Sequence, residues 1–268
     1  MKKYYLDTVA VRRLSKVLAN CAWTSYTSVF TVLELLSGIS EDQYSARKAA
    51  LTNLFNSGME IDWRMPMEII LESFKINERP DSISADDIKK IANELIVSSS
   101  YRDFVERNKM LQPNINSLTF FDQRLNAEFK KVFSEKTSEI REARTIDTEA
   151  KFLPINEKGI HALAEFICQK LLPTKFAGRS DEVRKNYNES IDRFIEVWLR
   201  YYDANANRLN EVSTNDWADV LHTTYLDSKL DIVFVSDDKK ITAVLNALLH
   251  SSSLSVDEFK ERILIDKN

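Results

Sequence analysis

The sequence predicts an α/β fold in which a domain with a parallel sheet is split by a large all-α insertion. Two short apolar segments, one near each end of the chain, each end in a carboxylate and are followed by a helical pattern. The long middle of the chain repeats apolar residues at helical spacing. The 268 residues include only four glycines and five prolines. So few turn-forming residues disfavour an all-β fold.

The first predicted elements are a strand, a helix and a second helix that contains a single acid. Tyr4 to Thr8 predicts a strand that ends in Asp7, and a helix follows at 9–18. Residues 28–39 predict the next helix, an apolar run that carries Glu34 and is ended by Gly38. Burying a glutamate is costly unless it has a partner. Glu34 is therefore either a cation ligand or an acid paired with a nearby Arg or Lys.

The middle of the chain is predicted to be helical. A third strand is predicted at 59–63, and Pro66 suits the first turn of the helix after it. Residues 79–87 predict a loop and a cap for a helix that runs to Val97. Further helices are predicted at 101–111, 117–143, 156–172 and 182–207. Residues 78–210 therefore form an all-α insertion of about domain size between the two parts of one domain, 1–77 and 211–268.

The last part of the chain repeats the strand, acid and helix order of the beginning. A helix at 213–222, capped by Ser213 or Thr214, carries Asp216 and Asp219 on one face. The strand at 231–235 leads to Ser236, Asp237 and Asp238, and a helix is predicted at 239–249. Strand alternation should turn one of these two adjacent aspartates inward and the other outward.

The two strand-end acids are expected to meet. The carboxyl ends of adjacent parallel strands converge on one crevice, so Asp7 and Asp238 should lie close together although the whole chain separates them. Carboxylates that meet repel each other unless a cation lies between them. Oxygen ligands of this kind suit Mg²⁺ or Mn²⁺ better than zinc.

In their order and settings, these segments resemble the PIN-domain family of metal-dependent nucleases. Members carry an aspartate after the first strand, a glutamate in the second helix, an aspartate opening a later helix and a final aspartate in a Thr/Ser-x-Asp motif. These positions fall on Asp7, Glu34, Asp219 and Asp238, with Ser236 as the serine of the last motif. Asp216, one turn before Asp219, is an alternative third acid. The resemblance covers 1–77 and 211–268 and implies a three-layer fold.

The resemblance implies divalent-metal-dependent hydrolysis of phosphodiester bonds, in RNA in preference to DNA. Asp7, Glu34, Asp219 and Asp238 would be the catalytic and metal-binding residues for Mg²⁺ or Mn²⁺. The residues expected to support these ligands are Asn215, Asp216, Ser236 and Asp237. The residues expected to contact nucleic acid are Arg12, Arg13, Lys16, Lys239 and Lys240. His222, three residues after Asp219, is interpreted as a helix-surface or supporting residue and not as a base.

Composition favours a second interpretation from another class. The net charge of −4 is not typical of a nucleic-acid-binding protein. The alternative is a catalytically inactive PIN-like binding or scaffold module that contacts a protein partner, or a second copy, through its helical insertion. Neither a Gly-rich phosphate loop nor a Gly-x-Ser-x-Gly elbow is present in the sequence.

Cellular location is predicted from the cysteines and from apolar run lengths. Cys21 and Cys168 are too few for a disulfide framework and lack metal-ligand spacing, which indicates buried thiols in a reducing cytoplasm. No apolar run reaches membrane-spanning length, and the first residues do not form a convincing secretory signal. We therefore expect a cytoplasmic protein without membrane contact.

Overall fold

The computed structural model describes residues 2–124, 127, 155–206, 216–248 and 252–265. Five strands form one all-parallel sheet in the order β3-β2-β1-β4-β5, so the α/β prediction is confirmed. The strands are β1 (Lys3–Leu6), β2 (Ser25–Ser28), β3 (Glu60–Asp62), β4 (Ile232–Val235) and β5 (Ser252–Leu254). All five lie in 1–77 and 211–268, and the described residues between 78 and 210 contain helices and no strand.

β1 is the central strand and joins the two ends of the chain. It pairs with β2 through Tyr5 and Tyr26, and with β4 through Leu6 and Val235. The four residues of β4 are apolar and buried, as expected for a strand covered on both faces. Because β1 and β4 are parallel neighbours, their carboxyl ends meet at one edge of the sheet.

β2 is a strand that the sequence pattern does not predict. Its residues are Ser25, Tyr26, Thr27 and Ser28, mostly polar yet all buried. Their polar groups find distant partners: Thr27 Oγ1 donates to the carbonyl of Leu6 at 2.7 Å, and the Tyr26 hydroxyl donates to the Tyr225 carbonyl. Burial of this strand therefore depends on contacts that only the folded chain provides.

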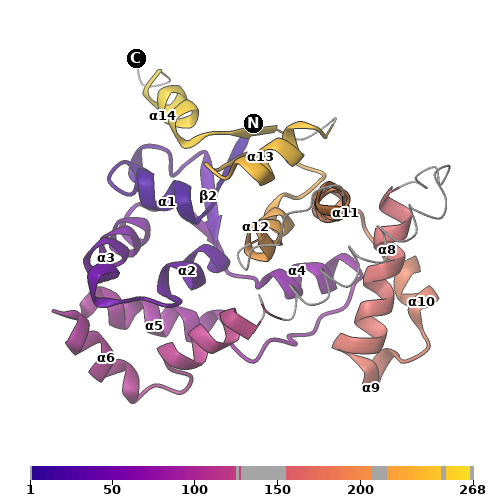
Figure 1. The fold of residues 1–268 in the computed structure, drawn as a ribbon, viewed down its shortest axis with the longest axis horizontal. Coiled ribbons are helices and arrows are strands. Elements are labelled where there is room, and N and C mark those ends of the chain that lie inside the picture. Colours follow the sequence, from indigo (N-terminus) through magenta and orange to yellow (C-terminus); the bar gives the residue numbers. More distant parts are fainter. Residues whose placement is uncertain (1, 125–126, 128–154, 207–215, 249–251, 266–268) are drawn as a thin grey trace.

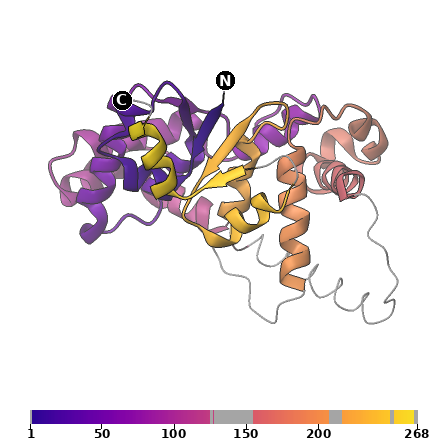
Figure 2. The ribbon, with the colours of Figure 1, turned by 90° about the horizontal axis from the view of Figure 1, so that it is seen from above.

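Helices cover both faces of the sheet (Figures 1 and 2). One side holds α1 (Thr8–Leu14), α2 (Val29–Leu36), α3 (Glu41–Asn56), α5 (Ala85–Val97), α6 (Tyr101–Lys109) and α14 (Val256–Ile265). The other side holds α4 (Pro66–Ser73), α8 (Ile155–Phe166), α9 (Pro173–Phe176), α10 (Ser180–Lys185), α11 (Asp192–Ala206), α12 (Asp216–His222) and α13 (Lys239–Asn246). Short helical turns lie at Leu18–Asn20, Ile167–Leu171 and Thr223–Tyr225.

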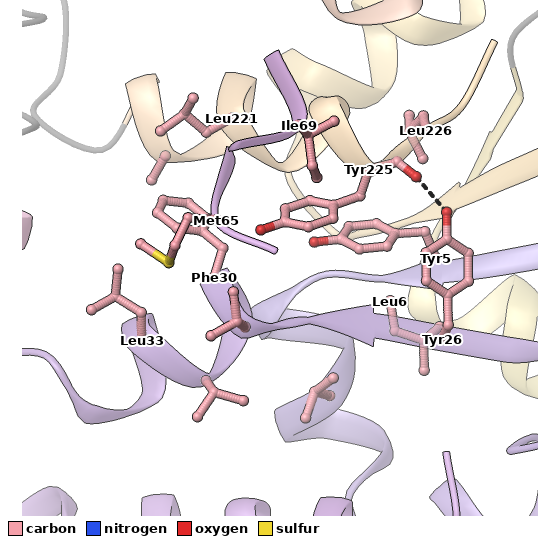
Figure 3. Close-up of a cluster of buried hydrophobic side chains, with 14 of the residues drawn as sticks. Tyr5, Leu6, Tyr26, Phe30, Leu33, Met65, Ile69, Leu221, Tyr225 and Leu226 are labelled. Atoms are coloured by element: carbon pink, nitrogen blue, oxygen red, sulfur yellow. Dashed lines mark hydrogen bonds between the residues drawn. The ribbon is translucent and has the colours of Figure 1, made fainter. Parts of the chain in front are cut away.

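The core is continuous between the sheet and the helical segment. Tyr5 stacks on Tyr225 with ring centroids 5.5 Å apart, in a cluster that also contains Phe30 (Figure 3). Buried side chains of the helical segment, such as Ile88 and Phe194, belong to the same apolar cluster. The described helices between 78 and 210 thus help to bury the sheet.

Several predicted helix boundaries are wrong. The helix predicted at 182–207 is two helices, α10 and α11, because residues 186–191 bond elsewhere: Asn188 N donates to the Ser73 carbonyl, and Ser228 N donates to the Ser190 carbonyl. Within that loop Glu189 has a φ of 66°. The first helix ends at Leu14, and the one predicted at 239–249 ends at Asn246. A helix is present at 115–124, and most of the one predicted at 117–143 lies outside the described residues.

Candidate functional site

Asp7 lies at the junction of β1, β4 and α1. It caps α1 by accepting from Ala10 N at 2.7 Å, and its own N–H donates to the Val235 carbonyl at 3.3 Å. Only 5% of its surface is exposed. Burial raises the pKa of Asp7 to about 6, although the charge of His222 and a hydrogen bond from Ser236 act in the opposite direction. Asp7 is therefore fixed in position by two secondary-structure elements.

Asp238 caps α13, three residues after the end of β4, the strand next to β1. Its carboxylate accepts from Lys240 N at 2.8 Å and Ile241 N at 2.9 Å, and its own N–H donates to Ser236 Oγ at 2.9 Å. Ser236 also lies close enough to Asp7 to lower the pKa of that carboxyl group. Asp237 instead accepts from Val256 N and forms an ion pair with Arg13, toward α14.

Glu34 is paired with a buried histidine. Its Oε2 accepts from Thr8 Oγ1 and from His222 Nε2, the latter at 2.7 Å. Burial alone would raise the pKa of Glu34, but the charge and hydrogen bond of His222, with Thr8, bring it below its usual value. Burial alone would lower the pKa of His222, but Glu34 and the nearby aspartates raise it. These shifts favour a carboxylate facing an imidazolium.

Asp219 lies on α12, one turn before His222. Burial, followed by the charges of Asp238 and Glu34, raises its pKa to about 8, and Asp7 contributes in the same direction. The four predicted acids, from four separate segments, therefore lie within electrostatic range of one another. Asp216 begins α12, but its side chain lies outside the described residues, as do Ser213, Thr214 and Asn215.

The fit of a divalent cation depends on the donor chemistry of these acids. Burial, together with the charges of the other carboxylates, would keep a proton on Asp219 at neutral pH, and a cation would offset the repulsion from those carboxylates. All four donors are carboxylates, which suit Mg²⁺ or Mn²⁺. No group of three or more His, Cys, Asp or Glu side chains in the described part of the chain is already arranged to hold an ion.

Cations lie beside these acids. Arg13 is neutralised by Asp237 and by Asp257, the latter at 2.8 Å. Arg47, which the sequence analysis did not single out, donates to the carbonyl of Ser37 at 2.6 Å beyond the end of α2. Burial and the charge of Arg12 lower the pKa of Arg47. All five predicted nucleic-acid contacts are exposed: Arg12, Arg13, Lys16, Lys239 and Lys240.

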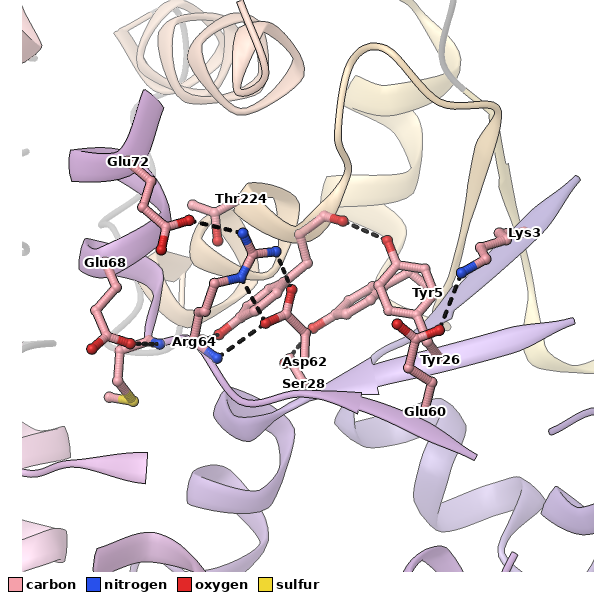
Figure 4. Close-up of polar contacts among 12 residues, drawn as sticks. Lys3, Tyr5, Tyr26, Ser28, Glu60, Asp62, Arg64, Glu68, Glu72 and Thr224 are labelled. Carbon is pink, nitrogen blue, oxygen red and sulfur yellow. Dashed lines mark hydrogen bonds and ion pairs between the residues drawn. The ribbon is translucent and has the colours of Figure 1, made fainter. Parts of the chain in front are cut away.

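A further strand-end acid, Asp62, provides a contrast (Figure 4). Asp62 is the last residue of β3, and both of its carboxylate oxygens accept hydrogen bonds from Arg64, with Nε–Oδ1 at 3.0 Å and Nη2–Oδ2 at 2.5 Å. Arg64 Nη1 also donates to Glu72 at 2.9 Å. The charge of Asp62 is thus satisfied within the protein, whereas the acids around Asp219 repel one another.

Two general features bear on location. Cys21 and Cys168 are both free and buried. Within the described residues, no helix has the length and apolar character needed to cross a membrane.

Three comparisons with known proteins, against family models, curated proteins and solved structures, found no match.

Proposed function

We propose that this protein is a PIN-like nuclease that uses Mg²⁺ or Mn²⁺ to hydrolyse phosphodiester bonds, in RNA in preference to DNA. The observation that carries the proposal is the position of Asp7 and Asp238, which cap the helices that follow the neighbouring parallel strands β1 and β4. The raised pKa of Asp219, which results from burial and from the charges of acids on three other segments, supports it. A group of buried and half-buried carboxylates that repel one another at the carboxyl edge of a parallel sheet is a suitable site for a divalent cation.

In this proposal the four acids have two different roles. Asp7, Asp219 and Asp238 hold the cation directly or through water, and Glu34 either ligates it or orients the attacking water. When bound, the ion would lower the pKa of that water and offset the charge that develops on the phosphate. As helix caps, Asp7 and Asp238 have their carboxylates fixed in position before substrate arrives. Ligands fixed in this way favour a preorganised metal site.

The substrate's phosphates would be held by the exposed cations near the acids. Arg12, Lys16 and Lys239 are exposed and form no ion pair with another described residue. They are therefore better candidates than Arg13, whose charge is already satisfied by two aspartates. The two free, buried thiols favour a cytoplasmic location.

The test is cleavage of single-stranded RNA, structured RNA and single-stranded DNA with Mn²⁺ or Mg²⁺. Asp7→Asn and Asp238→Asn keep the capping geometry but each removes one negative charge from the site. We expect each to lower the cleavage rate by about 100-fold or more, because several kcal/mol of charge stabilisation would be lost. Chelator should abolish cleavage by the unmodified protein.

Asp62→Asn is the matched control, since it also removes a strand-end carboxylate, but one that pairs with Arg64. It should leave the cleavage rate unchanged. Cleavage that survives both Asp7→Asn and chelator would refute the metal mechanism. A purified protein that cuts none of these substrates with either metal would favour the non-cutting binding module, in agreement with its net charge of −4.

A further inference from the structure

Glu34 receives both of its hydrogen bonds on one oxygen. Thr8 Oγ1 and His222 Nε2 donate to Oε2, and no group among the described residues donates to Oε1. A carboxylate held in this way has one oxygen committed to the protein and the other available to a ligand. The hydrogen bond between His222 and Glu34 joins two parts of the chain that are 188 positions apart in sequence.

The imidazole that makes this contact is itself fixed on its other side. His222 Nδ1 shares a hydrogen bond of 2.6 Å with the Tyr5 hydroxyl, which in turn shares one of 2.7 Å with Ser28 Oγ. The ring packs edge-on against Phe30 with centroids 5.1 Å apart, and only 2% of His222 is exposed. With both nitrogens bonded and the ring enclosed, the direction of Nε2 is determined by β1 and α2.

A buried histidine–glutamate pair is weak evidence for a stabilising role. Removing both groups from water costs free energy that their attraction often fails to recover. Hydrogen-bond partners of metal-ligating carboxylates, by contrast, commonly set the orientation of the ligand and the affinity for the metal. α12 would then contribute twice to the site, through Asp219 directly and through His222 acting on Glu34.

We propose that His222 is a positioning residue for Glu34: its Nε2 holds Oε2 so that Oε1 faces the bound cation or the attacking water. This inference rests on the proposed nuclease function. Tyr5 and Ser28 contribute by fixing the imidazole, and the arrangement requires only that Nε2 carry a hydrogen.

The two amide substitutions of His222 separate positioning from packing. In His222→Gln the amide nitrogen can take the place of Nε2 and still donate to Glu34, whereas in His222→Asn it takes the place of Nδ1 and reaches only Tyr5. The measurement is the affinity of the full chain for Mn²⁺ alone, by calorimetric titration, with cleavage rate as a second readout. We expect His222→Asn to weaken Mn²⁺ binding by about 10- to 100-fold, and His222→Gln to stay within about threefold of the unmodified protein.

The controls are the same two substitutions at His161, which pairs with Glu165 at 3.3 Å on the exposed face of α8. They should leave Mn²⁺ affinity and cleavage unchanged. Equal Mn²⁺ affinities of His222→Gln and His222→Asn, in proteins that fold, would overturn the positioning role while leaving the nuclease proposal intact. An unmodified protein that neither binds Mn²⁺ nor cleaves nucleic acid would overturn both.

Discussion

The pKa of Asp219 reflects both its burial and the charges of the residues around it. A carboxyl group on a helix surface would ionise near its usual pKa, but burial and the charges of Asp238 and Glu34 raise the pKa of Asp219 to about 8. In the metal-free protein its ionisation is therefore unfavourable near neutral pH. The pKa of Asp7 is shifted in the same direction, to about 6.

Because these pKa values are raised on folding, the stability of the metal-free protein depends on pH. An acid whose pKa is raised on folding weakens the folded state once the unfolded chain ionises, so the stability it contributes is present below about pH 4 and is lost as pH rises toward 8. Asp219→Asn should therefore raise the Tm of the metal-free protein at pH 8 by several degrees more than at pH 5. The expected gain is on the order of 2 kcal/mol, since the side chain is only partly enclosed.

Thermal melting in chelator at the two pH values measures this difference. The other pair at the site does not mask it: the raised pKa of His222 changes stability in the same direction with pH, and the lowered pKa of Glu34 matters only in acid. An equal decrease of Tm at both pH values on Asp219→Asn would contradict the proposed repulsion.

At the scale of elements, the fold can be predicted from the sequence where local chemistry determines structure. β1 and β4 are each followed by a carboxylate and then by a helix, so Asp7 and Asp238 could be predicted to lie at one edge of the sheet. That they cap α1 and α13 is seen only in the structure. The sequence does not predict an element whose structure depends on contacts with distant residues. β2 is polar in sequence, and its burial depends on partners such as Leu6 and Tyr225. His222 could be noticed beside Asp219, but its bond to Glu34 appears only in the fold.

The contact between α8 and α11 provides a prediction at the same scale. A Cβ added at Gly159, on α8, would lie 2.2 Å from Ile195 Cγ2 and 3.0 Å from Leu199 Cδ1 on α11. Alanine normally favours a helix over glycine by about 1 kcal/mol. Here overpacking, which costs about 1–3 kcal/mol, should prevail, so Gly159→Ala should lower the Tm by several degrees.

Lys158→Ala, at the exposed neighbouring position on α8, is the control and should change the Tm little. If Gly159→Ala raised the Tm, helix propensity would outweigh the contact, and the two helices would pack less closely than described. Calorimetric or optical melting of the three proteins suffices.

At the scale of the whole molecule, the helical segment and the sheet form one hydrophobic core. Arg193 of α11 is buried and donates to the carbonyls of Leu230 and Ile232, at 2.8 and 3.2 Å, where the chain enters β4. The predicted insertion therefore supports the strand that leads to Asp238. This role could not be predicted from sequence, because amphipathic helices of a separate module and of a shared core have the same apolar spacing.

The convergence of the four acids on a divalent cation is most directly tested by crystals soaked in Mn²⁺ and measured for its anomalous scattering. We expect an anomalous peak bounded by the carboxylates of Asp7, Asp219 and Asp238, at oxygen distances of about 2.0–2.3 Å. The peak should disappear in Asp238→Asn crystals and persist in Asp62→Asn crystals. No anomalous peak among these acids at saturating Mn²⁺ in the unmodified protein would contradict the proposed metal centre.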